Sequence, residues 1–427
     1  MKRVVKIRCY PNKTQISKIN YILGACRYVM NLYIEYERER YKKTDEFLTG
    51  YNFSKIINKL KKDPTSSVYW LCNVSSKALK DAIMTQEKAY KNYFKKIKKG
   101  EKCNSPMFKS RKKLNKESFF FIKDQVKFNI YDEYDNLRKN IIKIPILGKM
   151  RITGKNQLPN DKYVTSGRVI KEKDKYYLMF IYEDSTGYIV NKHDGFGIDL
   201  GIKYYATISN INHSYVKQYK HFKEYDNYIK NSNKIKYLRK LISNKSEFNY
   251  GKLLNKWMDE HPNEKLTENY KNIMKGASYN TSNIMKLNKK VSRLYTKLIN
   301  VCKDYINKLV YELVVRTKPL YITIEDLDIS EMLENDSSRK LHDYIHQSAF
   351  YMFRMQLINK CESYNTELRL ANKYFPSSKM CYKCGNINKN LRLSDRVYKC
   401  SCGNHIDRDI NAAFNLVNLS NKFYNII

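Results

Sequence analysis

The sequence predicts an α+β protein of several domains. Its 427 residues are enough for two or three domains with buried cores. Helical periodicity begins at Lys13 and returns at about 75–98, whereas residues 118–183 contain short β-branched and aromatic runs. Further along, two apolar strands each end in an acidic residue. These patterns predict a helix-bearing β domain followed by an α/β domain.

The first half of the chain predicts a β domain interrupted by helices. Residues 1–9 alternate as a strand does, and residues 13–115 are mostly helical in pattern. Six short runs follow, separated by Gly, Asp, Asn and Lys turns; they include VKFNI at 126–130. We expect a small barrel or sandwich completed by the N-terminal strand, with the helices as an insertion. A domain boundary is expected at 184–194.

The charge of the chain indicates a polyanionic partner. There are 81 Lys and Arg against 42 Asp and Glu, a formal charge of +39. A protein this basic repels itself unless a polyanion neutralises it, so the charge favours nucleic-acid binding. The alternative is codon bias, since Lys, Asn, Ile and Tyr are abundant, as in an AT-rich genome. Asp and Glu codons tolerate such DNA too, so codon bias alone does not account for the imbalance.

The ten cysteines are expected to be reduced. The chain opens with MKRVVKIRCYP, a basic, β-rich start without the apolar region of a secretory signal. No stretch approaches the roughly eighteen apolar residues that span a membrane. We therefore expect no membrane association and a cytosolic or nuclear compartment, where disulfides are rare.

Three acidic residues stand where an RNase H-like fold would bring carboxylates together. Asp199 ends the strand in GFGID, Glu325 ends the strand in YITIE, and Asp409 begins a C-terminal helix. In that fold the first strand, a later central strand and a helix across the sheet meet at one site. Carboxylates arranged in this way are suited to two catalytic Mg²⁺ ions, which activate water and stabilise the leaving oxygen of a phosphodiester.

Each acid also has a simpler interpretation. Asp199 fits a hairpin turn, Glu325 a solvated strand end, and Asp409 a helix N-terminus, where the dipole favours an acid. The order Asp, Glu, Asp on strand, strand and helix is what favours a common site. Asp407 is the alternative to Asp409, but an N-cap role suits it and leaves Asp409 on the first helical turn.

Four cysteines near the C-terminus predict one structural Zn²⁺ in a zinc ribbon. CYKCG and CSCG supply two close pairs, and four thiolates complete a tetrahedron with no open position for catalysis. Gly385 and Gly403 permit the tight turns that follow the pairs. The second pair is C-x-C, a tighter bite, and His405 is the substitute ligand if the geometry fails. The predicted ligands are Cys381, Cys384, Cys400 and Cys402.

Together these residues resemble the TnpB family, RNA-guided nucleases encoded by insertion sequences and related to compact type V CRISPR effectors and the Fanzor proteins. The resemblance covers nearly the whole chain and is weakest over about 215–290, where this sequence is enlarged. The segments that carry it are GIDLG, IEDL, YFPSSKMCYKCG, CSCG and DRDINAAFNL, and less specifically KIRCYPNKTQ, ACRYVMNLY, SPMFKSRK and IPILGKMRI.

The resemblance implies a RuvC-like nuclease domain in which Asp199, Glu325 and Asp409 are the catalytic, Mg²⁺-binding acids. It also implies a β-barrel wedge domain with an inserted helical recognition lobe, and leaves Arg408 as either a contact to the scissile strand or a surface arginine. The domains expected are the wedge at 1–12 and 116–188, the lobe at 13–115, the nuclease at 189–375 and 406–427, and the zinc ribbon at 376–405.

The family further implies a bound guide RNA that pairs with a double-stranded DNA target, while the Lys/Arg surface holds the heteroduplex by its backbone. The activity expected is RNA-guided DNA cleavage associated with a transposable element. The alternatives are a nuclease-inactive, RNA-guided DNA-binding regulator and an RNase H-like transposase. The complete set of three acids favours cleavage. We expect a cytoplasmic, nucleoid-associated protein, or a nuclear one in a eukaryotic host.

Overall fold

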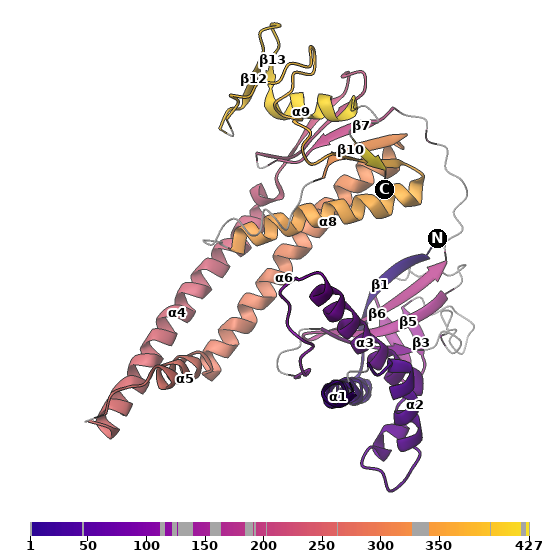
Figure 1. The fold of residues 1–427 in the computed structure, drawn as a ribbon, viewed down its shortest axis with the longest axis vertical. Coiled ribbons are helices and arrows are strands. Elements are labelled where there is room, and N and C mark those ends of the chain that lie inside the picture. The colour runs from indigo at the N-terminus through magenta and orange to yellow at the C-terminus, as the bar shows by residue number, and fades with distance from the viewer. Residues whose placement is uncertain are drawn as a thin grey trace. The chain divides into compact units, whose positions relative to one another are not determined.

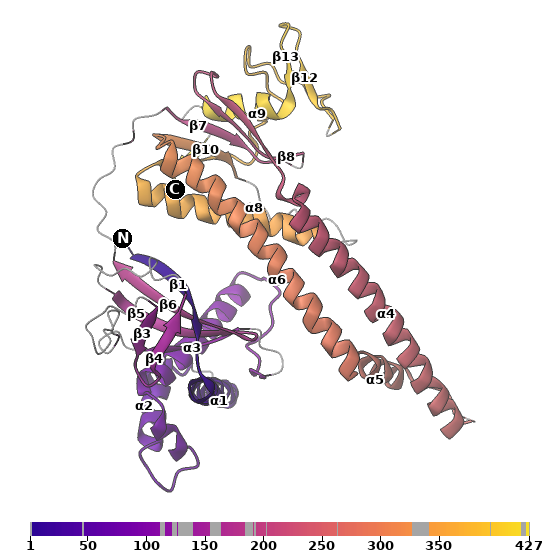
Figure 2. The ribbon, with the colours of Figure 1, turned by 180° about the vertical axis from the view of Figure 1, so that it is seen from behind.

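A computed structural model describes most of the chain as two compact units, Met1–Thr186 and Gly187–Ile427 (Figures 1 and 2). The predicted strand VKFNI lies outside the described residues apart from Val126, as does most of the boundary predicted at 184–194. The described residues are 2–44, 47–111, 116–121, 126, 140–153, 164–183, 191, 194–201, 203–262, 264–326, 341–392, 394–419 and 424–426.

The first unit contains a six-stranded antiparallel sheet in the order β2-β5-β6-β1-β4-β3. The N-terminal strand β1 lies inside this sheet and pairs with β6 from Lys2 opposite Glu183 to Cys9 opposite Tyr176. Among the described residues β2 and β3 are the edges, so closure into a barrel stays a prediction. The strands are β1 (Lys2–Tyr10), β2 (Lys116–Phe121), β3 (Ile141–Ile144), β4 (Gly148–Ile152), β5 (Val164–Glu172) and β6 (Lys175–Glu183).

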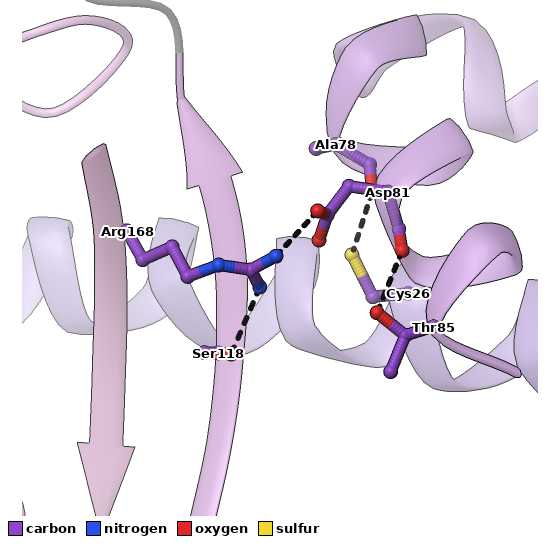
Figure 3. Close-up of polar contacts among 6 residues, drawn as sticks. All are labelled: Cys26, Ala78, Asp81, Thr85, Ser118 and Arg168. Carbon is purple, nitrogen blue, oxygen red and sulfur yellow. Dashed lines mark hydrogen bonds and ion pairs between the residues drawn. The ribbon is translucent and has the colours of Figure 1, made fainter. Parts of the chain in front are cut away.

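Ion pairs as well as apolar packing hold the helices of the first unit against this sheet. Arg168 of β5 reaches Asp81 on α3 and donates to Ser118 Oγ of β2 at 3.4 Å (Figure 3). Arg27 on α1 pairs with Glu117 of β2. These side chains are only 11–27% exposed, so solvent screens the pairs less than it would at the surface. The helices are α1 (Lys13–Thr44), α2 (Gly50–Leu60) and α3 (Ser76–Lys98), with a 3₁₀ turn at Tyr69–Asn73.

The second unit is built on a mixed sheet in the order β14-β11-β10-β7-β8-β9. β7 pairs antiparallel with β8 and parallel with β10, and β10 is parallel to β11. Helix α9 contacts β7, β8 and β10. This is the strand, strand and helix arrangement that the RNase H-like prediction required. The elements are β7 (Phe196–Asp199), β8 (Tyr204–Asn210), β9 (Val216–Lys220), β10 (Tyr321–Glu325), α8 (Leu341–Tyr364), β11 (Glu367–Ala371), α9 (Arg408–Val417) and β14 (Tyr424–Ile426).

The enlarged middle segment forms a helical arm, formed by α4 (Asp226–Glu260), α5 (Glu268–Tyr279) and α6 (Ser282–Val310). α4 and α6 run side by side, with α5 at their far end (Figures 1 and 2). The sequence indicated a helix only for the later part, because Asn and Ser in α4 and α5 have low helix propensity. Part of the seam is polar, where the Ser246 and Ser278 hydroxyls lie 2.9 Å apart. Of the helices described, none has the length and apolarity to cross a membrane.

Helix α9 lies directly against β7 because Gly197 has no side chain. A Cβ on Gly197 would lie 2.3 Å from the Ala413 carbonyl oxygen and 2.4 Å from the Val417 nitrogen. Those are backbone atoms of α9, which cannot swing aside as a side-chain tip can. The glycine therefore sets the depth at which the helix packs on the sheet.

We expect Gly197→Ala to destabilise the second unit by about 1–3 kcal/mol, because the added methyl group must push the helix off the strand. Gly251→Ala on α4 is the matched control, since no atom lies within 4 Å of its Cβ position. That substitution should stabilise its helix by about 0.5–1 kcal/mol. Denaturant unfolding of the two variants measures the difference, and equal stabilities would contradict the packing role of Gly197.

Candidate active site and metal centre

The three predicted acids lie at one edge of the second sheet. β7 and β10 are parallel neighbours, with Ile198 opposite Ile324, so the acids that follow them, Asp199 and Glu325, lie side by side. Asp409 is in the first turn of α9, which crosses the same strands. The structure thus brings all three carboxylates together, although their catalytic role stays a prediction.

The carboxylates raise the proton affinity of the site. Burial raises the pKa of Asp199 well above its usual value, and the nearby charges of Glu325 and Asp409 raise it further. Burial also raises the pKa of Glu325 and of Asp409, which is only 8% exposed. Arg408 opposes the rise at all three acids. A cluster of acids that resists ionisation in this way is relieved by a bound cation.

Asp407 caps the helix, as the sequence predicted. Its Oδ1 accepts hydrogen bonds from the backbone N–H of Asp409 at 2.9 Å and of Ile410 at 3.3 Å. This cap orients the first turn and leaves the Asp409 side chain free of the capping role. Arg408 donates to the backbone oxygens of Arg392 at 3.2 Å and Asp395 at 3.4 Å, so its guanidinium also holds the neighbouring loop.

The sequence gave no indication of the side chains that connect the acids to the cysteine segment. Ser377, which is 3% exposed, donates its hydroxyl hydrogen to Glu325 Oε1. Asn415 on α9 donates at 2.7 Å to the backbone oxygens of both Ser377 and Met380. Asn411, one turn earlier, donates to Met380 O at 2.7 Å and accepts from the backbone N–H that follows Cys381 at 3.2 Å. The spacing of the two asparagines on α9 was the available signal, but it was read as polar surface.

The four cysteines converge as predicted. Their sulfur atoms all lie within 4.8 Å of one another. Cys381 Sγ is 3.7 Å from Cys402 Sγ, and Cys384 Sγ is 3.6 Å from Cys400 Sγ. The tighter C-x-C bite therefore does not prevent a four-sulfur cluster, and His405, on the short strand β13 (His405–Asp407), is not part of it.

Backbone turns shape each cysteine pair. Gly385 donates to the Cys381 carbonyl at 2.9 Å and Gly403 to the Cys400 carbonyl at 3.0 Å. Both glycines have positive φ, +73° and +82°, which other residues rarely adopt. The backbone N–H of Cys402 lowers the pKa of the Cys400 thiol to about 6. A thiolate is therefore favoured at neutral pH, and the thiolate is the form that binds a metal.

Comparison with known sequences finds two matching domain descriptions. A profile described as "Cas12f1-like, TNB domain" matches residues 350–416, which include the cysteines and most of α9. A profile named HTH_OrfB_IS605, described as a helix-turn-helix domain, matches residues 1–46. Within that range the structure has the strand β1 followed by one long helix, α1.

Full-length relatives agree with these matches. Proteins named "Putative RNA-guided DNA endonuclease" from Streptomyces pristinaespiralis and from Escherichia coli K12 are each 24% identical to this chain over 98% of its length. The matches cover 89% and 92% of those proteins. A TnpB-like protein of Acanthamoeba polyphaga mimivirus is 26% identical over 58% of this chain and 41% of its own.

Among solved structures, the mini-RNA-guided endonuclease CRISPR-Cas phi3 covers 97% of this chain and 92% of its own. It is 11% identical, with a TM-score of 0.50, which speaks to the fold alone. The profile matches at both ends, the relatives along nearly the full length and the motifs around the three acids agree with one another. The chain is thus a relative of the TnpB family of proteins encoded by insertion sequences.

Proposed function

We propose that this protein is an RNA-guided DNA endonuclease associated with a transposable element, and that it hydrolyses phosphodiester bonds with Asp199, Glu325 and Asp409. The observation that carries the proposal is the convergence of three buried acids that raise one another's pKa. A fold has little reason to keep such a cluster unless a cation neutralises it. The names of the full-length relatives supply the guide RNA and the DNA substrate.

The donor set suits two Mg²⁺ ions. Carboxylate oxygens are hard ligands, and Mg²⁺ takes one or two carboxylates and completes its coordination with water and substrate phosphate. Bound there, the ions would activate the attacking water and stabilise the leaving oxygen. Asp199, Glu325 and Asp409 hold the charge for them, Ser377 orients Glu325, and the Asp407 cap orients the turn that carries Asp409.

The charge of the chain supports both nucleic-acid partners. A formal charge of +39 favours contact with many phosphates, and such contacts do not depend on sequence. Pairing between the guide RNA and one strand of the double-stranded DNA target would then provide sequence specificity. In the proposed domain plan, the wedge and the helical recognition lobe make up the first unit, whereas the nuclease domain and zinc ribbon make up the second.

Two other functions fit the fold but account for less. A nuclease-inactive regulator would not need all three acids, and a transposase would use a similar set of acids for strand transfer. Arm helices α4 to α6 hold 18 Lys and Arg against 7 Asp and Glu, which suits nucleic acid of either kind and does not separate the alternatives. A cleavage assay separates all three functions.

The cysteine cluster is proposed to hold one structural Zn²⁺. Four thiolates fill a tetrahedral site completely, so no position remains for a catalytic water. The site then acts by shape, because Asn411 and Asn415 join its first turn to α9.

We expect Asp199→Ala, Glu325→Gln and Asp409→Asn each to lower the rate of RNA-guided plasmid cleavage in Mg²⁺ by more than about a hundredfold. Loss of a group that only supports a ligand typically costs about 10–100-fold, and these acids are proposed as the ligands themselves. The measurement uses protein purified with its co-expressed RNA.

Asp407→Asn is the matched control for Asp409→Asn. Asparagine caps a helix about as well as aspartate, so the variant should fold and retain most of the activity. Target binding without cleavage by the parent protein would favour the regulator. Joining of DNA ends in place of hydrolysis would favour the transposase.

We expect the metal-free protein to lose stability as the pH rises from about 4. The folded state binds a proton at Asp199 more tightly than the unfolded state does, because its pKa is raised. The stability from that proton is therefore present at low pH and is lost as the pH rises through the folded-state pKa. Asp199→Asn should reduce this slope, and Mg²⁺ should raise the Tm of the parent more than that of the variant.

Thermal unfolding in EDTA and in Mg²⁺ across this pH range tests that expectation. Glu312→Gln is a suitable control, because this glutamate pairs with Lys217 at 2.7 Å and its pKa is lowered, not raised. The control should lose stability toward low pH instead. The same pH slope in the parent and in Asp199→Asn would contradict the proposed strain among the acids.

We expect the purified protein to contain one equivalent of zinc and Cys400→Ala to contain far less, since three thiolates hold zinc more weakly than four. Cys72→Ala is the control, because Cys72 is an exposed free cysteine on the first unit. Elemental analysis gives the zinc content, and limited proteolysis reports whether residues 376–405 become accessible. Equal zinc in the two variants would contradict the site.

A further inference from the structure

A small basic hollow lies on the first unit, in the part of the chain that carries none of the three acids. It has a volume of about 400 Å³, within the range of pockets that hold small ligands. Its apolar lining comes from Phe47, before α2, and Phe94, near the end of α3. The lysines at its rim are Lys91, Lys95, Lys98 and Lys99.

The rim is a consequence of helical spacing. Positions 91, 95, 98 and 99 share one face of α3, and Phe94 lies among them. Lys91 pairs with Glu87 at 3.0 Å. No acidic side chain in the described part of the chain pairs with Lys95, Lys98 or Lys99. Three exposed cations therefore surround an aromatic surface.

The aromatic lining is held in place from below. The rings of Phe47 and Phe94 meet edge to face at 5.9 Å, and Phe94 stacks on Tyr90 at 6.2 Å. Leu48, next to Phe47, donates its N–H to Glu37 Oε2 at 3.1 Å and accepts from the Tyr33 hydroxyl at 2.5 Å.

We propose that this hollow binds an unpaired nucleotide of the RNA bound by the protein, with the base on the two phenylalanines and the adjacent phosphates on the lysines. The ligand must offer a flat apolar face and negative charge together, and a nucleotide has both. Folded RNA presents unpaired bases in its loops, whereas duplex DNA must first be opened at a cost. This assignment rests on the proposed function for the presence of RNA.

The first test measures binding of an oligouridine single strand and of a blunt RNA duplex to the full-length protein. We expect Phe94→Leu and Phe47→Leu each to weaken single-strand binding about tenfold and to leave duplex binding unchanged, because leucine fills the space but offers no face for stacking. Thermal unfolding checks that both variants fold. Folded variants with unchanged single-strand affinity would overturn the proposal.

Charge variants decide the question if a phenylalanine variant fails to fold, since the substituted lysines are exposed. Removal of Lys95, Lys98 and Lys99 together, each to Ala, should lower the slope of log affinity against log salt for the single strand by about 2. The matched control removes three exposed lysines of the same unit, Lys55, Lys59 and Lys62. An equal change in both variants would overturn the proposal, because it would show only a loss of general charge.

Ultraviolet cross-linking of the purified RNA complex identifies the occupant. We expect a ribonucleotide adduct on the peptide that contains Phe94, lost in the rim variant and kept in the control. A deoxyribonucleotide adduct with bound DNA would overturn the RNA assignment. So would binding to phosphatidylserine vesicles that depends on the same lysines, since it would indicate a lipid surface. Cleavage by the phenylalanine variants is measured beside Asp199→Ala: dependence on Asp199 without any effect at the hollow would reject this inference alone.

Discussion

The close approach of α9 to β7 is the constraint on which the second unit depends. Gly197 leaves room for the backbone of α9 at Ala413 and Val417. The first turn of the helix then carries Asp409 to the edge of the sheet where Asp199 and Glu325 end their strands. A site assembled from three distant segments needs such a fixed contact, because a small displacement of one acid would separate it from the other two.

The same helix also connects the acids to the cysteine cluster. Asn411 and Asn415 bind the backbone around Met380, and Ser377 in the same segment reaches Glu325. Buried amides that keep their hydrogen bonds specify one arrangement, since any other would leave polar groups unpaired at a cost. The zinc ribbon is thus coupled mechanically to the carboxylates, although its four sulfur atoms leave no position for catalysis.

Local patterns predicted the parts of the site that chemistry requires, and missed the parts that tertiary contacts require. Asp199 and Glu325 end apolar strands, and the cysteine pairs have ligand spacing, so short windows of sequence were sufficient. Ser377 and Glu325 are 52 positions apart, and their contact exists only once β10 and the cysteine segment meet. The arm was similarly underestimated, since its polar seam around Ser246 and Ser278 does not follow the apolar periodicity from which helices are predicted.

The charge of the chain and the charge of the site oppose each other, and this opposition has a consequence for function. Nucleic acid is drawn to a protein with a formal charge of +39, but the phosphate to be cut must approach Asp199, Glu325 and Asp409. Without cations these acids repel the phosphate and hold protons instead, as the raised pKa of Asp199 indicates. With divalent cations the same acids become the support for a positive centre that attracts phosphate oxygens. Metal binding therefore decides whether the scissile bond can enter the site at all, while the distributed Lys and Arg residues determine how tightly the rest of the nucleic acid is held.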